Sequence, residues 1–239
     1  MSIDPRAVMA ARNNADLYAA MFTSHGLRFE RFDFAFVGKD QPPPYYGNLT
    51  VVSPDHEAEV ILQIKEFAVD FGGTVSLKDS FCQLDLTANG FKTLFEASWF
   101  WRGADSTPPT SDWRQIDTVA DLELWEQAWK ASGSPTPDRM FHETLLKDPD
   151  VVFLGRKADG VFDAGCIANR SRDCMGVSNV FSCIPSEHIF AQASAAVSAL
   201  EPGLPLVGYG ADDALEAAQE AGFTDVGALR VLATRAADF

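Results

Sequence analysis

Cysteine and histidine are the residue types whose spacing would first reveal metal or thiol chemistry. Cys82, Cys166, Cys174 and Cys183 lie far apart, form no Cys-x-x-Cys pair and have no histidine at the spacing of zinc ligands. We therefore predict no metal site and interpret the four thiols as small buried apolar side chains. A thiol nucleophile, Cys174 or Cys183 together with His188, remains an alternative that a thiol-reactivity assay at neutral pH would test.

Motifs of several other chemistries are missing. The chain has no Gly-x-Ser-x-Gly nucleophile elbow and no phosphate loop that ends in Gly-Lys-Ser or Gly-Lys-Thr. Gly208-Tyr209-Gly210 is followed by the acidic Asp212 and Asp213 and is too short for a dinucleotide fingerprint. The sequence therefore does not favour a serine hydrolase, a P-loop nucleotidase or a dinucleotide-dependent oxidoreductase.

Composition narrows the possible partners. The chain has 239 residues, 46% of them hydrophobic, and its 34 acidic and 19 basic residues give a formal net charge of -15. This balance disfavours nucleic acid and anionic membranes, because phosphate binding needs concentrated Lys and Arg. No stretch approaches the roughly 18 uninterrupted apolar residues of a membrane-spanning helix, and residues 1–12 lack the apolar core of a secretory signal. We expect a cytoplasmic globular protein; whether it is a monomer or a homodimer stays undetermined.

Turn-forming residues and two adjacent prolines fill residues 103–112. We therefore predict a domain of residues 1–104, a linker of residues 105–112 and a domain of residues 113–239. The first part predicts a helix over 6–24, an aromatic-rich strand over 27–36 with a phase slip typical of a bulge, a strand over 45–52, a helix from 54, a strand over 74–80, a short helix ending near 89 and a strand over 93–102.

The second part predicts a mixed α/β order. We expect strands over 113–117, 151–156, 161–169, 174–182, 205–209 and 226–233, and helices over 119–131, 138–147, 186–199 and 212–221. A strand, a capped helix, a Gly-Phe pair and a final strand occur in the same order from Leu77 and from Leu206. Because Gly suits the left-handed end of a helix while Phe returns to the core, the echo predicts a duplicated fold.

The segment from Leu215 to Val231, in which a helix ends in Gly-Phe and leads to a closing strand, resembles the C-terminal segment of the GNAT (GCN5-related N-acetyltransferase) superfamily. Residues 112–125 are similar to that family's opening strand, Asp-containing turn and first helix, and residues 113–233 follow its whole order of elements. Residues 45–102 look like a partial second copy. The resemblance implies an α/β fold, a mixed twisted sheet flanked by helices, in tandem with a partial N-terminal repeat.

The resemblance also implies a cofactor and a substrate class. Acetyl-CoA or another acyl-CoA would lie between the strands over 174–182 and 205–209, and the acceptor would be an amine of a small molecule or a peptide. In the family, main-chain groups of the first strand hold the pantetheine arm, and a glycine-containing loop wraps the pyrophosphate at the start of the next helix. The positions that this implies for cofactor binding are Val177, Ser178, Asn179, Val180 and Phe181 in the strand, and Ser186 and His188 in the loop.

The loop over 182–188 departs from the family pattern, because it contains no glycine. Pro185 has no N–H to donate to phosphate, and Glu187 adds negative charge where the first helical turn is expected. We expect Ser186 to cap the helix and a protonated His188 to offset part of that charge. Pro185→Gly with Glu187→Gly tests whether the loop limits the affinity for CoA.

Acyl transfer to an amine needs a base for the amine and a proton donor for the leaving thiolate, which in the family is often a Tyr in the helix after the fifth strand. The helix over 212–221 has no Tyr, so Tyr209, just before it, is the candidate donor. Glu143, His142 and Asp163 are the candidate bases. Two functions stay open: an acyl-CoA-dependent N-acyltransferase, and a catalytically inactive protein of this fold that binds a small molecule or a protein without CoA.

Overall fold

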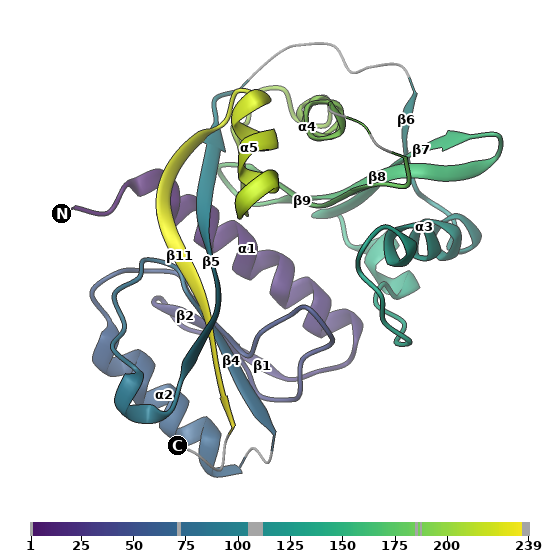
Figure 1. The fold of residues 1–239 in the computed structure, drawn as a ribbon. Helices are drawn as coiled ribbons and strands as arrows, with labels where there is room; N and C mark the ends of the chain where they lie inside the picture. Colours follow the sequence, from purple (N-terminus) through teal and green to yellow (C-terminus); the bar gives the residue numbers. More distant parts are fainter. Residues whose placement is uncertain (1, 71–72, 105–111, 185, 187, 236–239) are drawn as a thin grey trace.

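Eleven strands form one mixed, twisted sheet with helices on both faces (Figure 1). The computed structural model describes residues 2–70, 73–104, 112–184, 186 and 188–235. The strand order is β1-β2-β3-β4-β11-β5-β10-β9-β8-β7-β6. The predicted fold class, a mixed sheet flanked by helices, is confirmed.

The first part of the chain contributes five strands. Its elements are α1 (Pro5–Ser24), β1 (Phe29–Arg31), β2 (Ala35–Gly38), β3 (Leu49–Val51), α2 (Glu57–Asp70), β4 (Thr74–Asp79), the 3₁₀ helix η1 (Thr87–Asn89) and β5 (Lys92–Arg102). The single strand predicted over 27–36 is wrong, because the chain turns where Phe32 N–H donates to the carbonyl of Ala35 (2.8 Å) and makes a β1–β2 hairpin. The strand predicted over 45–52 shortens to β3, since Tyr45 has a φ of 68° and cannot continue an extended strand.

The second part contributes the other six strands. Its elements are β6 (Trp113–Gln115), α3 (Val119–Ala131), the 3₁₀ helix η2 (Glu143–Lys147), β7 (Val151–Ala158), β8 (Val161–Arg170), β9 (Met175–Ser182), α4 (Ile189–Ser198), β10 (Leu206–Gly210), α5 (Asp212–Glu220) and β11 (Thr224–Arg235). The helix predicted over 138–147 is wrong in its first half, because the buried Glu126 carboxylate accepts the N–H groups of Met140 (2.8 Å) and Phe141 (3.2 Å). Those donors are therefore held by a side chain, and only the 3₁₀ helix η2 follows.

The two longest strands cross between the parts. Strand β11 lies between β4 and β5, and β5 lies between β11 and β10, so the last strand of each part pairs only with strands of the other part (Figure 1). Outward from the β11–β5 pair, both directions meet an antiparallel pair, a parallel pair and two antiparallel pairs, and the second part adds one more antiparallel pair, β7–β6. A duplicated fold would produce this order, and the duplication stays a prediction. In the predicted linker over 105–112, residues 105–111 lie outside the described residues.

Helix α1 crosses the junction of the two parts (Figure 1). Pro5 begins the helix, and Asp4 caps it by accepting the N–H of Arg6 (2.8 Å). Its first half packs against strands of both parts, and its second half packs through Leu17 and Met21 into the cluster around α3 and η2. Helices α4 and α5 cover the opposite face of the second part. None of the described helices combines the length and the apolar character needed to cross a membrane.

Candidate functional site

Strands β9 and β10 are parallel neighbours that separate soon after they meet. Leu206 pairs with Met175 and Val207 with Gly176, and no pairing between the two strands follows. Strand β10 is instead held along its whole length by β5, while β9 is held by β8. These pairings with β5 and β8 hold β10 and β9 apart. Beyond Gly176, the backbone groups on the facing edges of the two strands do not pair with each other and can bind a ligand.

Two local features shape the point of divergence. A Cβ on Gly208 would lie 2.4 Å from the Phe100 ring and 2.8 Å from the carbonyl oxygen of Val177, so only glycine allows β10 to approach β9 this closely. In β9, a register shift places two residues opposite one residue of β8, and the first of the two, Asn179, has a φ of 51°. Such a bulge redirects the bulged side chain, and Asn tolerates this conformation better than most residues.

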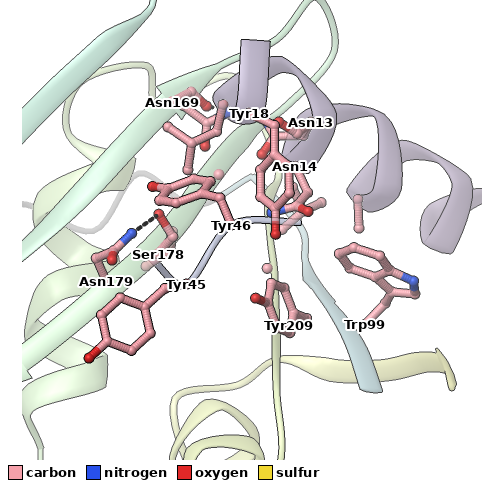
Figure 2. A pocket seen from close by; sticks show the side chains of 16 residues that line it. Asn13, Asn14, Tyr18, Tyr45, Tyr46, Trp99, Asn169, Ser178, Asn179 and Tyr209 are labelled. Carbon is pink, nitrogen blue, oxygen red and sulfur yellow. Dashed lines mark hydrogen bonds between the residues drawn. The ribbon is translucent and has the colours of Figure 1, made fainter. Parts of the chain in front are cut away.

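A cavity of about 230 Å³ opens where the strands diverge (Figure 2). Helix α1, the segment before β3, and strands β5, β8, β9 and β10 all contribute to its wall. The residues that line it are Ala10, Asn13, Asn14, Leu17, Tyr18, Tyr45, Tyr46, Trp99, Asn169, Gly176, Val177, Ser178, Asn179, Val207, Gly208 and Tyr209. Both parts of the chain therefore build this cavity.

Paired amides fix α1 against the second part. The side chain of Asn13 donates to the carbonyl of Asn169 (3.1 Å), and the side chain of Asn169 donates back to the carbonyl of Asn13 (2.9 Å). A Cβ on Gly176 would lie 2.2 Å from the amide oxygens of both. Glycine at this position is thus required for the two amides to meet above β9, which positions the wall that α1 provides.

Three tyrosines of the wall, Tyr18, Tyr46 and Tyr209, are neutral. Burial raises the pKa of Tyr18, Tyr46 and Tyr209 above the usual value, so all three phenols keep their protons at neutral pH. The described residues that line the cavity include no Asp, Glu, His, Lys or Arg. Its surface therefore combines aromatic rings with amides and hydroxyls and carries no ionised side chain.

Lys78 lies behind this wall, on β4, with only 2% of its surface exposed. Its Nζ donates to Oδ1 of Asn14 (2.6 Å) and sits 3.9 Å from the centroid of the Tyr209 ring. It also lies over the rings of Tyr18 (5.0 Å) and Trp99 (5.5 Å). Burial lowers the pKa of Lys78 well below its ordinary value. The amine of Lys78 thus lies against three aromatic rings of the cavity wall.

The structure places some of the predicted cofactor positions together. Val177, Ser178 and Asn179 line the cavity at the divergence. Phe181 does not line the cavity and packs instead on Trp125 of α3, with ring centroids 5.0 Å apart. Val180 packs beside the cluster on the opposite face, around α4 and α5.

The two predicted loop residues lie at the start of α4. His188 is exposed and is the N-cap residue, and it makes no side-chain capping bond. The cap predicted at Ser186 is wrong, because the helix begins at Ile189. The first turn of α4 contains no acidic residue, although the sequence has Glu187 just before the cap residue. Pro185 and Glu187 lie outside the described residues.

Among the predicted catalytic residues, only Tyr209 reaches the cavity. Glu143 is exposed at the start of η2 and does not line it. His142 packs edge-on against His25, with ring centroids 4.4 Å apart, and Asp163 pairs with Arg156 (2.8 Å). The structure therefore brings the predicted proton donor to the site without any of the three predicted bases.

The interpretation of all four thiols as buried is wrong for two of them, because Cys82 and Cys183 are exposed. Cys166 and Cys174 are buried, and burial raises the pKa of Cys174 to about 12. Cys183 lies 3.2 Å from the hydroxyl of Ser132. Within the described ranges, no three side chains of His, Cys, Asp or Glu gather as metal ligands would.

Sequence reasoning missed every wall residue of the first part, including Asn13, Asn14 and Tyr18, and it missed Lys78 behind the wall. One signal was available: adjacent Asn13 and Asn14 interrupt a long apolar helix, and both are buried. Buried polar side chains need partners, so such a pair on a helix marks a site or a contact. Nothing in the local pattern of β4 indicates the burial of Lys78.

No protein-family model matches the chain, and no curated protein sequence matches it. Solved structures match it in fold. A GCN5-related N-acetyltransferase from Kribbella flavida is 16% identical, with a TM-score of 0.59 over 94% of this chain and 95% of that one. A conserved protein of unknown function from Staphylococcus epidermidis is 12% identical, with a TM-score of 0.57 over 84% of each chain. A GCN5-related N-acetyltransferase from Sphaerobacter thermophilus is 10% identical, with a TM-score of 0.54 over 79% and 72%. The chain has the fold of the GCN5-related N-acetyltransferases, as the resemblance predicts.

Proposed function

We propose that the protein is an acyl-CoA-dependent N-acyltransferase that uses the cleft between β9 and β10. Fold alone does not determine activity, so the proposal depends on the site. The observation that carries it is the divergence of β9 and β10 after two paired positions, with Val177, Ser178, Asn179 and Tyr209 around the cavity that opens there.

The residues at the divergence fit an acyl-CoA. Unpaired backbone groups of β9 beyond Gly176 suit the amides of a pantetheine arm, and the N-terminus of α4 suits a pyrophosphate. When bound, acyl-CoA supplies a thioester carbonyl that an amine can attack. Ser178 and Asn179, which line the cavity, would hold the acyl end of the cofactor.

Tyr209 supplies the proton in this proposal. Its raised pKa keeps the phenol protonated at neutral pH, so the hydroxyl can donate to the thiolate as the C–S bond breaks. The ring is held edge-on against Trp99, with centroids 5.5 Å apart, and by Lys78 over its face. The described wall contains no carboxylate that could take the proton of the amine, so that proton passes to water.

Calorimetric titration with acetyl-CoA and with free CoA at low salt tests the proposal. We expect micromolar binding, and no heat at millimolar CoA would overturn it. Glu143→Gln then tests the predicted base: unchanged turnover agrees with its exposed position, whereas a large loss would place the base outside the described cavity wall.

A second candidate function is a ligand-binding protein of the same fold without CoA. It is favoured by the glycine-free segment over 182–188 and by a cavity wall without a carboxylate base. A small molecule that bound the cavity in the absence of any CoA binding would support this candidate.

A further inference from the structure

The neutral cavity restricts which amines can enter it. An ammonium ion that leaves water needs a counter-charge or several strong acceptors, and otherwise its desolvation costs several kcal/mol. The described wall offers aromatic rings, amides and hydroxyls, and no carboxylate. An alkylamine, which is charged at neutral pH, would have to lose its proton before it entered.

Aromatic rings can themselves hold a cation, but three of the five rings that line this cavity already carry an amine. Lys78 Nζ lies over the rings of Tyr18, Trp99 and Tyr209, at 3.9 to 5.5 Å from their centroids. A ligand cation could not use the ring faces that this amine covers as a cation–π site without displacing it. Lys78 therefore leaves fewer ring faces of this wall for an ammonium ion.

We propose that the acceptor is an arylamine, whose amino group is uncharged at neutral pH and whose ring packs on the aromatic wall of this cavity. This inference rests on the proposed function. Tyr18 and Tyr46 meet edge-on, with ring centroids 4.9 Å apart, and offer a surface for a further ring. A cavity of about 230 Å³ suits one substituted ring, since about 150 Å³ suffices for benzene.

The reaction balances without a base in the wall. The arylamine nitrogen attacks the thioester carbonyl, a C–N bond forms, and the C–S bond breaks. Tyr209 protonates the thiolate, water takes the proton that the nitrogen loses, and solvent returns a proton to Tyr209. The products are an N-acyl arylamine and free CoA.

Two isomeric amines test the inference. p-Toluidine is neutral at pH 7, and benzylamine has the same atoms and is charged. With acetyl-CoA at pH 7, we expect kcat/KM, measured by release of CoA, to be at least 100-fold higher for p-toluidine. Equal or better turnover of benzylamine would overturn the inference.

Lys78→Met keeps the length of the side chain and removes the amine. We expect the ratio of kcat/KM for benzylamine to kcat/KM for p-toluidine to rise about tenfold, because a change in the support of Tyr209 affects both amines alike. The matched control is Lys157→Met, which removes another lysine that lies over a ring, Phe162 (4.6 Å), outside the cavity and should leave this ratio unchanged. An unchanged ratio in a folded Lys78→Met protein would contradict the role of Lys78.

Binding without turnover separates the two proposals. Trp99 lines the cavity, so its fluorescence can report binding of each amine to the wild-type protein. Binding of p-toluidine without any binding of CoA would overturn the proposed function and support the preference of the cavity. Binding of CoA with a preference for benzylamine would overturn the inference alone. If Lys78→Met does not fold, the wild-type comparison still decides.

Discussion

The two parallel strand pairs, β3–β4 and β9–β10, share a backbone arrangement and differ in chemistry. Each pair matches at two positions before it diverges, and each is connected by one crossover helix, α2 or α4. The registers make Leu77 the counterpart of Leu206 and Asp79 the counterpart of Gly208, in agreement with the echo in the sequence. A direct comparison of the two divergences is therefore possible.

At the first divergence, a charged side chain occupies a position at which the second divergence has no side chain. The Asp79 carboxylate is 1% exposed, accepts the N–H groups of Gln83 and Leu84 (both 3.1 Å) and pairs with Arg230 (3.0 Å). At the second divergence the counterpart is Gly208, where the Phe100 ring and the Val177 carbonyl leave no room for a side chain. The same strand geometry thus holds an internal ion pair in one part and a cavity in the other.

The N-terminal ends of the two crossover helices, α2 and α4, also differ in charge. Helix α2 has Glu57 and Glu59 in its first turn, whereas α4 has no acidic residue there. A hollow of about 310 Å³ beside the first divergence is lined by the carboxylates of Asp55, Glu57 and Asp79. Carboxylates repel a pyrophosphate. The two divergences therefore differ in the charge at their strand and helix ends, although their backbones correspond.

Separation of the two parts is expected to have the largest effect. Residues 1–104 alone leave β4 and β5 without β11, and residues 113–239 alone leave β10 without β5. We expect neither piece to fold alone, and the two pieces to form a 1:1 complex when they are produced together, as measured by circular dichroism and gel filtration. Cooperative unfolding of residues 113–239 alone would show instead that the parts are independent domains.

Asp79→Asn should have the next largest effect, because it removes the counter-ion of Arg230 in a buried position. We expect the free energy of unfolding, measured with urea, to fall by about 3 kcal/mol. The matched control, Asp163→Asn, breaks the less buried pair with Arg156 in the second part and should cost about 1 kcal/mol. Unchanged CoA affinity in both variants is expected, and a loss in Asp79→Asn would place the cofactor at the first divergence.

Tyr209→Phe sharpens the assignment to the second divergence. We expect kcat to fall about 100-fold, equivalent to about 2.7 kcal/mol, with little change in melting temperature. The raised pKa of Tyr209 predicts that wild-type activity persists as the pH rises and is lost only above pH 10, when the phenol ionises. Ser132→Ala, which removes a surface hydroxyl, is the control; equal turnover of Tyr209→Phe and wild type would remove Tyr209 from the mechanism.

Gly208→Ala tests whether the close approach of β10 to β9 matters. The new Cβ would meet Phe100 and the Val177 carbonyl, so we expect a loss of about 2 kcal/mol in unfolding free energy and weaker binding of CoA. Gly203→Ala, whose Cβ would meet nothing within 4 Å, is the control and should change neither quantity. Full CoA affinity in Gly208→Ala would show that the cofactor does not use this gap.

The pH dependence of the stability of Lys78→Met tests whether burial shifts the pKa of Lys78. The folded pKa of Lys78 is lowered by burial, so between that value and 10.5 the unfolded chain binds more protons than the folded chain. The free energy of unfolding of the wild type should therefore rise relative to that of the variant as the pH increases through this range, by up to about 1.4 kcal/mol per pH unit. Parallel pH profiles in urea titrations would mean that Lys78 keeps its ordinary pKa.

Periodic elements could be predicted from the sequence, and elements that side chains reshape could not. The helix over 119–131 and the strands over 161–169 and 174–182 agree closely with α3, β8 and β9, because their apolar spacing is regular. The helix predicted over 138–147 is wrong in its first half because the carboxylate of Glu126, which lies in α3, accepts hydrogen bonds from backbone N–H groups of this segment. Glu126 lies 14 residues before Met140, so the apolar spacing within the segment cannot indicate this contact.

The residues of the candidate site also differ in whether the sequence could predict them. Tyr209 and Val177 to Asn179 were found because a family resemblance places them on neighbouring strands. Asn13 and Lys78 were not, because they come from the other part of the chain, and the contact between Asn13 and Asn169 spans 156 residues.

The sequence by itself determined the order of elements, the Gly-Phe helix ends, the glycine-free loop and the acidic balance, since each is a property of neighbouring residues or of the whole composition. Only the tertiary structure decided that β5 and β11 cross between the parts and that α1 closes the cavity. The reason is physical: apolar periodicity states which face of an element is buried, but not which distant element buries it. Partner choice depends on the packing of the complete chain, and here that packing leaves one strand divergence charged and the other neutral.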